Sequence, residues 1–108
     1  MFKSTQNKGF QLKFANGFEI SVQWGTMNYC SRKWDGDWNE AMNHECWESG
    51  TAEVAVFDNE GGIVNIGFND DSIIGWVDTE NIARIISVVQ SSTTSNEIEK
   101  KIQSFIRK

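Results

Sequence analysis

The chain has 108 residues, 39% of them hydrophobic and 12% aromatic, with two cysteines, no proline and a formal net charge of −5. This length predicts one domain with a single core, and two cysteines are too few for the disulfide framework of a small secreted protein. No run of about 18 apolar residues is present, so the sequence predicts no membrane span, no membrane partner and a place in the cytoplasm.

Charge is unevenly distributed along the chain. Twelve acidic residues and no Lys or Arg lie between Asp35 and Glu80, whereas the two flanks carry ten basic and three acidic residues. A polyanionic surface repels nucleic-acid backbones, which excludes long nucleic acids as partners. It suits a basic protein surface, or an acidic mimic of a nucleic-acid backbone. The alternative is an acidic face that the protein's own basic ends neutralise.

Residues 9–24 predict a β-hairpin. Apolar and polar residues alternate on both sides of Asn16-Gly17, and this alternation around Asn-Gly is a strong hairpin signal. Seven large apolar side chains share one face of the hairpin: Phe10, Leu12, Phe14, Phe18, Ile20, Val22 and Trp24. Another element is therefore expected to cover that face.

Residues 25–51 predict a long connection of unusual composition. It holds three of the five tryptophans, the only Tyr and His, and both cysteines. Connections of this length are usually functional or disordered, and three tryptophans argue against disorder. Trp34, Trp38, Ala41, Met42 and Cys46 recur at helical spacing. This predicts a short helix over about residues 37–47, with its tryptophans leaning on the sheet.

The connection contains no complete catalytic or metal motif. Cys30, His44 and Cys46 lack the paired spacing of a structural zinc site, and the run from Asp35 departs from a calcium loop at its Gly and its bidentate Glu. A Cys–His nucleophile pair would have no third group and no oxyanion loop. The sequence thus predicts no enzyme activity, no cofactor and no metal, and leaves open whether Cys30 and Cys46 are paired.

Binding is the function that the composition of this connection favours. Trp, Tyr and Arg are enriched at interaction hot spots, and aromatic rings beside basic residues also stack on nucleotides. The candidate binding residues are Tyr29, Arg32, Lys33, Trp34, Asp35, Asp37, Trp38, Glu40, Glu45 and Glu48. They predict a protein partner and leave open a small nucleotide-like ligand.

Residues 52–77 predict more strands. Alternating runs over 52–57 and 63–68 flank a turn over 58–62 that contains two glycines, and a further short strand is expected over 72–77. With the first hairpin, these runs predict a sheet of four to five mainly antiparallel strands.

Residues 78–107 change period and predict two helices. Asp78 or Thr79 would cap the first, which has apolar residues at three- and four-residue spacing. Thr94 and Glu97 have the capping-box spacing at the start of the second. Its apolar stripe is Ile98, Ile102, Phe105 and Ile106. The first helix is expected to cover the hairpins, whereas the stripe of the second would pack on the core or face a partner, and a homodimer stays open. The predicted fold is a single α+β domain.

Several short runs carry a resemblance: residues 9–10 (GF), 14–17 (FANG), 20–25 (ISVQWG), 28–30 (NYC), 51–58 (TAEVAVFD) and 75–77 (GWV). They are similar to runs in a family of small accessory proteins encoded by tailed bacteriophages, for which no activity is known. The resemblance implies an accessory protein acting in the host cytoplasm. Such proteins often block a host enzyme or defence component, or sequester its nucleotide messenger. The predicted function is therefore a non-enzymatic phage protein that binds and inhibits or modulates a host protein through residues 25–51.

Overall fold

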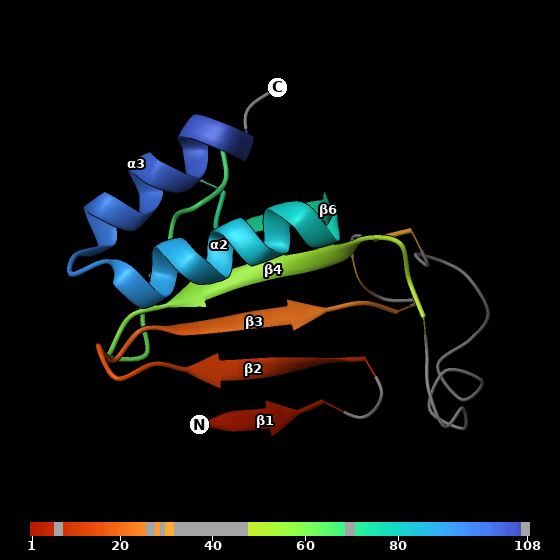
Figure 1. Cartoon of the computed structure of the whole chain (residues 1–108), viewed down its shortest axis with the longest axis horizontal. Helices are drawn as coiled ribbons and strands as arrows, with labels where there is room; N and C mark the ends of the chain where they lie inside the picture. Colours follow the sequence, from red (N-terminus) through yellow and green to blue (C-terminus); the bar gives the residue numbers. More distant parts are fainter. Residues whose placement is uncertain (6–7, 26–27, 29, 32–47, 69–70, 107–108) are drawn as a thin grey trace.

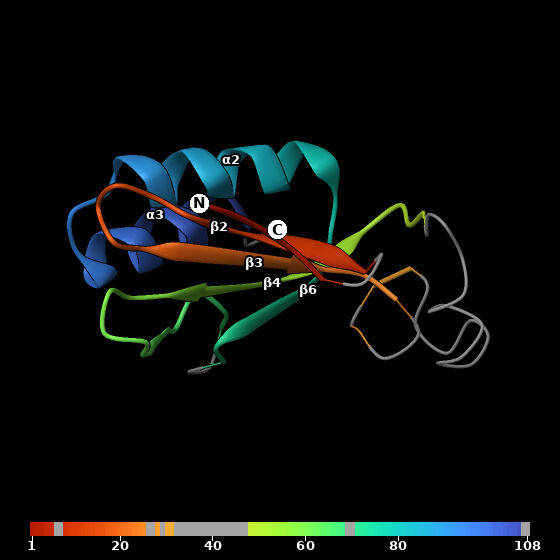
Figure 2. The same cartoon turned by 90° about the horizontal axis from the view of Figure 1, so that it is seen from below.

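A computed structural model describes residues 1–5, 8–25, 28, 30–31, 48–68 and 71–106. Within these ranges it contains a six-stranded antiparallel sheet and two helices, which confirms the α+β fold (Figure 1). The strands are β1 (Phe2–Ser4), β2 (Gly9–Lys13), β3 (Glu19–Gln23), β4 (Ala52–Phe57), β5 (Ile63–Val64) and β6 (Ile73–Val77). The helices are α2 (Thr79–Ser91) and α3 (Ser95–Ile106). Both helices lie on the same face of the sheet (Figure 2).

The predicted hairpin is formed by β2 and β3. Phe10 lies opposite Val22 and Leu12 opposite Ile20, so the apolar side chains share one face. The strands are closed by a turn in which the Gly17 N–H donates to the Phe14 carbonyl at 2.9 Å. Gly17 has a φ of +91°, a conformation that glycine adopts without steric cost. The hairpin that the sequence predicted around Asn16-Gly17 is confirmed.

The sheet has more strands than the four to five expected from the sequence. The addition is β1, whose three residues pair antiparallel with β2. Three residues are too short for a period-two pattern to be recognised. Strand β1 is held in place by its pairing with the edge of β2. The residues of β1 alone carry no signal for this pairing.

Strand β4 is the centre of the second half of the sheet. One edge pairs with β3, and the other is shared between β5, opposite Val56 and Phe57, and β6, opposite Ala52 to Ala55. The strand expected over 63–68 is therefore wrong in length, because β5 ends at Val64. Beyond it Ile66 is fully buried and its N–H donates to the Val64 carbonyl at 2.9 Å, so the chain turns into the core.

Helix α2 covers the apolar face of the sheet, as expected. Asp78 is its N-cap, with Oδ1 accepting from the Asn81 N–H at 2.9 Å. Ile85 and Val89 are fully buried, and the helix packs against β3. Figure 1 shows α2 running alongside β4, with α3 beyond it.

Helix α3 also belongs to the core, which decides the alternative that the sequence left open. Ile98 and Ile102 are fully buried, and Phe105 and Ile106 pack against the same cluster. The helix contacts α2 and β5, and Gln103 Nε2 donates to the Gly67 carbonyl at 3.0 Å. The apolar stripe of α3 is thus turned inward and does not form a partner surface.

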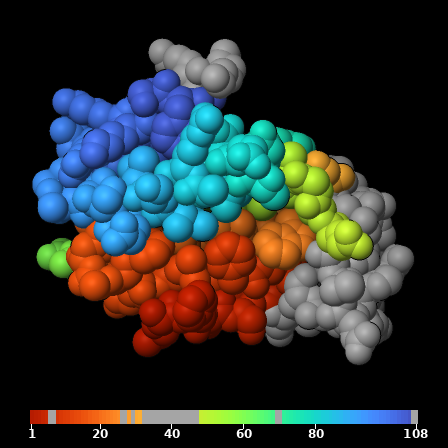
Figure 3. All heavy atoms as spheres, viewed as in Figure 1, coloured from red at the N-terminus to blue at the C-terminus, as the bar shows by residue number. Residues whose placement is uncertain are grey.

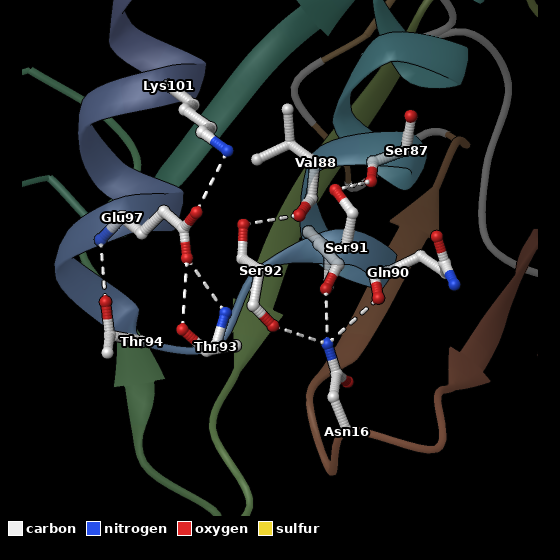
Figure 4. Close-up of polar contacts among 11 residues, drawn as sticks. Asn16, Ser87, Val88, Gln90, Ser91, Ser92, Thr93, Thr94, Glu97 and Lys101 are labelled. Atoms are coloured by element: carbon white, nitrogen blue, oxygen red, sulfur yellow. Dashed lines mark hydrogen bonds and ion pairs between the residues drawn. The ribbon is translucent and has the colours of Figure 1, made fainter.

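One side chain of the first hairpin connects the sheet to the helices (Figure 4). Asn16 Nδ2 donates to the carbonyls of Val89, Gln90 and Ser92 at 2.8, 3.2 and 2.9 Å, and its Oδ1 accepts from the Phe18 N–H at 3.1 Å. The last carbonyls of a helix have no partner within the helix. Asn16 therefore completes the end of α2 where no glycine cap is present.

In the part of the chain that is described, neither helix is long and apolar enough to cross a membrane.

Candidate functional site

The described end of the long connection borders an apolar hollow of about 410 Å³. Its apolar wall comes from β2, the end of β3, β4, β6 and α2: Phe10, Val22, Trp24, Ala52, Val77 and Ile82. Its more polar rim consists of Glu48, Ser49, Gly50, Thr51 and Thr79. In Figure 3 the yellow-green residues from 48 onward lie beside the start of α2 in cyan and the end of β3 in orange. This volume is in the range of pockets that bind small molecules or single large side chains.

The aromatic wall of the hollow is held in a fixed arrangement. The rings of Phe10 and Trp24 meet edge to face, with centroids 6.3 Å apart and planes at 71°. Phe10 is placed by the β2–β3 register, and the backbone N–H of Trp24 donates to the Lys8 carbonyl at 2.6 Å. Edge-to-face pairs contribute about 0.5–1.5 kcal/mol beyond burial. A ligand would thus meet an aromatic surface that is already organised.

Hydrogen bonds fix the described ends of the connection next to this wall. The Ser31 N–H donates to Thr51 Oγ1 at 2.8 Å, and Ser49 Oγ donates to the Thr51 carbonyl at 2.6 Å. Cys30 is a buried free thiol whose sulfur accepts from the Gly25 N–H at 3.3 Å. Gly25 has a φ of +156°, at the point where the chain leaves β3. The structure thus has Cys30 as a free thiol, whereas Cys46 lies outside the described residues.

The described lining of the hollow carries an acidic charge. Of the described wall and rim residues one is ionisable, Glu48, which is exposed. Thr79 on the rim lies between Asp78 and Glu80 in the sequence, and the Asp78 carboxylate already occupies the N-terminus of α2. Partial burial lowers the pKa of the Lys8 ammonium, since desolvation disfavours its charged form. An anionic ligand would therefore meet carboxylates and a filled helix terminus.

The structure brings one predicted binding residue, Glu48, to the hollow. The other nine lie outside the described residues: Tyr29, Arg32, Lys33, Trp34, Asp35, Asp37, Trp38, Glu40 and Glu45. The same holds for the short helix predicted over 37–47 and for His44 and Cys46. Elsewhere in the chain, where placement is described, no three His, Cys, Asp or Glu side chains form a group able to hold a metal ion.

Sequence reasoning assigned Phe10, Trp24 and Ile82 to the core alone. All three pack against the core and also remain partly exposed at its end, where they line the hollow. The available signal was the position of Trp24, a large aromatic residue at the last step of an alternating strand and directly before the long connection. Alternation identifies the inward face of a strand but does not reveal where the core stops.

Comparison with models of known families, with curated proteins and with solved structures gave no match for this chain.

Proposed function

We propose that this chain is a non-enzymatic binding protein whose apolar hollow receives a large side chain of a protein partner. The observation that carries the proposal is the organised Phe10–Trp24 wall of a hollow of about 410 Å³ that is mostly apolar. Hot-spot residues at interfaces are large aromatic or basic side chains that enter such desolvated sites. The acidic rim and the stretch from Asp35 to Glu80, which contains no Lys or Arg, favour a partner with a basic surface around its anchor.

The resemblance to tailed-phage accessory proteins makes the partner a bacterial host protein, including a defence protein, in the host cytoplasm. Binding would then inhibit or modulate that protein. The proposal also includes the candidate residues Tyr29, Arg32 and Trp34 of the connection, which lie outside the described residues. The proposal needs no reaction at the site, because occupation of the partner's surface is enough to block it.

A small nucleotide-like ligand is a weaker alternative. Phosphates are held by Lys, Arg or unoccupied helix N-termini, whereas the described lining carries Glu48 and the helix end is capped by Asp78. An acidic mimic of a nucleic-acid backbone is supported by the charge count alone. The two alternatives differ in what they bind: a released small molecule in the first case, and proteins that DNA displaces in the second.

Filling the hollow tests the proposal. Thr79 is exposed at the first position of α2 and lines the hollow, so Thr79→Trp should occupy it without disturbing the core. Ser87→Trp, exposed on the same helix about two turns beyond Thr79 and not among the residues that line the hollow, is the matched control. Tagged wild-type, Thr79→Trp and Ser87→Trp proteins are used to capture partners from bacterial lysate, and the captured protein is then titrated by calorimetry. Thr79→Trp should weaken binding about tenfold or more, or ~1.4 kcal/mol, while the control binds as wild type.

Equal binding by all three proteins would show that the hollow is not part of the interface.

The contribution of the connection is tested separately with an Arg32→Ala/Trp34→Ala double variant, which should stay folded and lose the partner. Mass spectrometry of small molecules released from the purified protein tests the nucleotide alternative. If a nucleotide is released from the wild-type protein but not from Thr79→Trp, the hollow binds a nucleotide and not a protein partner. Displacement of the captured protein by duplex DNA would favour mimicry.

A further inference from the structure

Trp76 lies in β6 with an unusual backbone conformation. Its φ is +51°, and among the described residues it is the one with a side chain at a positive φ. The left-handed conformation is unfavourable for an L-residue, because it brings the Cβ too close to the following carbonyl oxygen. The Trp76 side chain is nevertheless 57% exposed, although a tryptophan gains most when it is buried. Strain without burial at a large aromatic residue indicates a role outside the core.

A β-bulge accounts for the direction of this side chain. Val77 lies opposite Ala52 and Ile74 opposite Val54, so Gly75 and Trp76 together face one residue of β4. Val77 is buried and Ile74 packs against the same core. These two inward-facing residues are three positions apart, whereas residues on one face of a regular strand are separated by an even number of positions. The extra residue leaves Trp76 away from the core. Bulges are frequent next to functional sites, where they redirect a side chain in this way.

A second hollow, of about 450 Å³, lies beside the ring and is lined by Asp71, Ile73, Gly75 and Trp76. None of these residues lines the apolar hollow. Asp71 is held by its own loop, because its carbonyl accepts from the Gly67 N–H at 2.9 Å and its Oδ1 accepts from the Ile73 N–H at 3.3 Å. A Cβ on Gly67 would lie 2.8 Å from the Asp71 carbonyl oxygen, so this loop requires glycine there. The hollow thus combines an aromatic ring with a fixed carboxylate.

We propose that Trp76 and Asp71 form a second binding site, which takes the guanidinium group of an arginine side chain of a protein partner. A guanidinium stacks on aromatic faces and, in its own plane, its N–H groups donate hydrogen bonds to carboxylate oxygens. Among the described lining residues Asp71 is the charged one, and β4 to β6 lie within the stretch that has no Lys or Arg of its own. A second copy of this chain would bring a net charge of −5 to this acidic region, so charge favours a basic partner. The site does not rest on the proposed function of the apolar hollow.

The site can be probed with the full chain and a single residue. The ¹⁵N-labelled protein is titrated by NMR with Nα-acetyl-arginine methylamide, and in parallel with the citrulline analogue, which has nearly the same shape and no charge. The arginine probe should shift the Trp76 indole N–H and the amides of Ile73 and Gly75, saturating in the millimolar range that one buried contact provides (roughly −4 kcal/mol). The citrulline probe should leave these signals in place.

Two variants separate binding from folding. Trp76→Gly removes the ring and accepts the positive φ without strain, so it should remain folded. Asp71→Asn keeps an Oδ1 acceptor for the Ile73 N–H and removes only the charge. Each should weaken the arginine probe about fivefold or more, whereas Phe2→Ala, which removes another highly exposed aromatic ring, should bind as wild type.

Four results would overturn the site. Three of them are no movement of the Trp76 signal at about 50 mM arginine probe, equal shifts with citrulline, and unchanged affinity of Asp71→Asn. The fourth is a set of shifts confined to the Phe10 and Trp24 signals, which would assign the probe to the apolar hollow instead. Because Thr79→Trp leaves Trp76 and Asp71 intact, its effect on partner capture reports on the proposed function alone.

Discussion

Glu97 ties the start of α3 to the turn that precedes it (Figure 4). Its Oε1 accepts from the Thr93 N–H at 2.9 Å, and the Glu97 N–H donates to Thr94 Oγ1 at 3.1 Å. The capping box predicted from Thr94 and Glu97 is confirmed for one of its two hydrogen bonds, the one from the Glu97 N–H to the Thr94 hydroxyl. In the second bond the Glu97 carboxylate accepts from the Thr93 N–H, whereas a standard capping box would use the Thr94 N–H.

This contact predicts a pH-dependent stability. The hydrogen bond from the Thr93 backbone, then that from Lys101, hold the pKa of the Glu97 carboxyl below its ordinary value. A lowered pKa in the folded state stabilises the protein at neutral pH, and this contribution is lost as the pH falls through that pKa. Glu97→Gln should therefore lower the Tm at pH 7, and the difference from wild type should shrink toward pH 3.

Thermal unfolding between pH 7 and 3 measures this effect. Glu99→Gln is the matched control, because it removes the same charge from the same helix two residues along. A constant Tm difference between wild type and Glu97→Gln over the whole range would contradict the assignment of the cap. So would an equal, pH-dependent loss in Glu99→Gln.

The hairpin and α2 are joined by a single polar side chain. Helices commonly end with a glycine in the left-handed conformation, but Ser92 follows α2 in an extended conformation. The amide of Asn16 satisfies the terminal carbonyls in its place. The Asn-Gly pair thus has two roles, one in the local turn and one at a helix end more than 70 residues away.

Replacing Asn16 should consequently destabilise two elements together. Asn16→Ala leaves part-buried carbonyls of α2 without their donor and should lower the free energy of unfolding by about 1–3 kcal/mol. Asn16→Asp should cost more, because a carboxylate would face the negative end of the helix. Urea denaturation checks both, with the exposed Asn96→Ala as a control expected within about 0.5 kcal/mol of wild type. An unchanged midpoint for Asn16→Asp would show that the amide contributes nothing to α2.

At the scale of the whole molecule, the described residues form one core between the sheet and the two helices. Residues of β3, β4, β5, β6, α2 and α3 belong to a single buried cluster. Because Ile98 and Ile102 are part of it, α3 cannot be treated as a detachable tail. Both proposed sites lie at the margins of this cluster, where a strand ends or is bulged.

Ile98→Ala tests that assignment of α3. Loss of a fully buried isoleucine should lower the free energy of unfolding by about 2–5 kcal/mol. The exposed Lys100→Ala on the same helix should change it by less than about 0.5 kcal/mol. Chemical denaturation followed by fluorescence measures both, and a loss below about 1 kcal/mol for Ile98→Ala would place α3 outside the cooperative core.

Periodicity was enough to predict the elements whose signal is local. The alternation around Asn16-Gly17 predicted β2 and β3, and the spacing from Ile82 to Val89 predicted α2 with Asp78 or Thr79 as its cap, of which the structure shows Asp78. Periodicity failed for strands whose position or length depends on contacts with segments outside the strand itself. The short β1 is held by β2, and β5 stops early because Ile66 enters the core.

The sequence by itself determined the α+β class, the inward faces of the hairpin and helices, and the acidic stretch from Asp35 to Glu80. These follow from residue order alone, since hydrophobic period and charge are properties of neighbouring residues. Only the tertiary structure decided that α3 is core, that Asn16 caps α2, and that Trp24 and Trp76 border separate hollows. Each of these depends on contacts between segments far apart in the chain, for which a single sequence carries no signal.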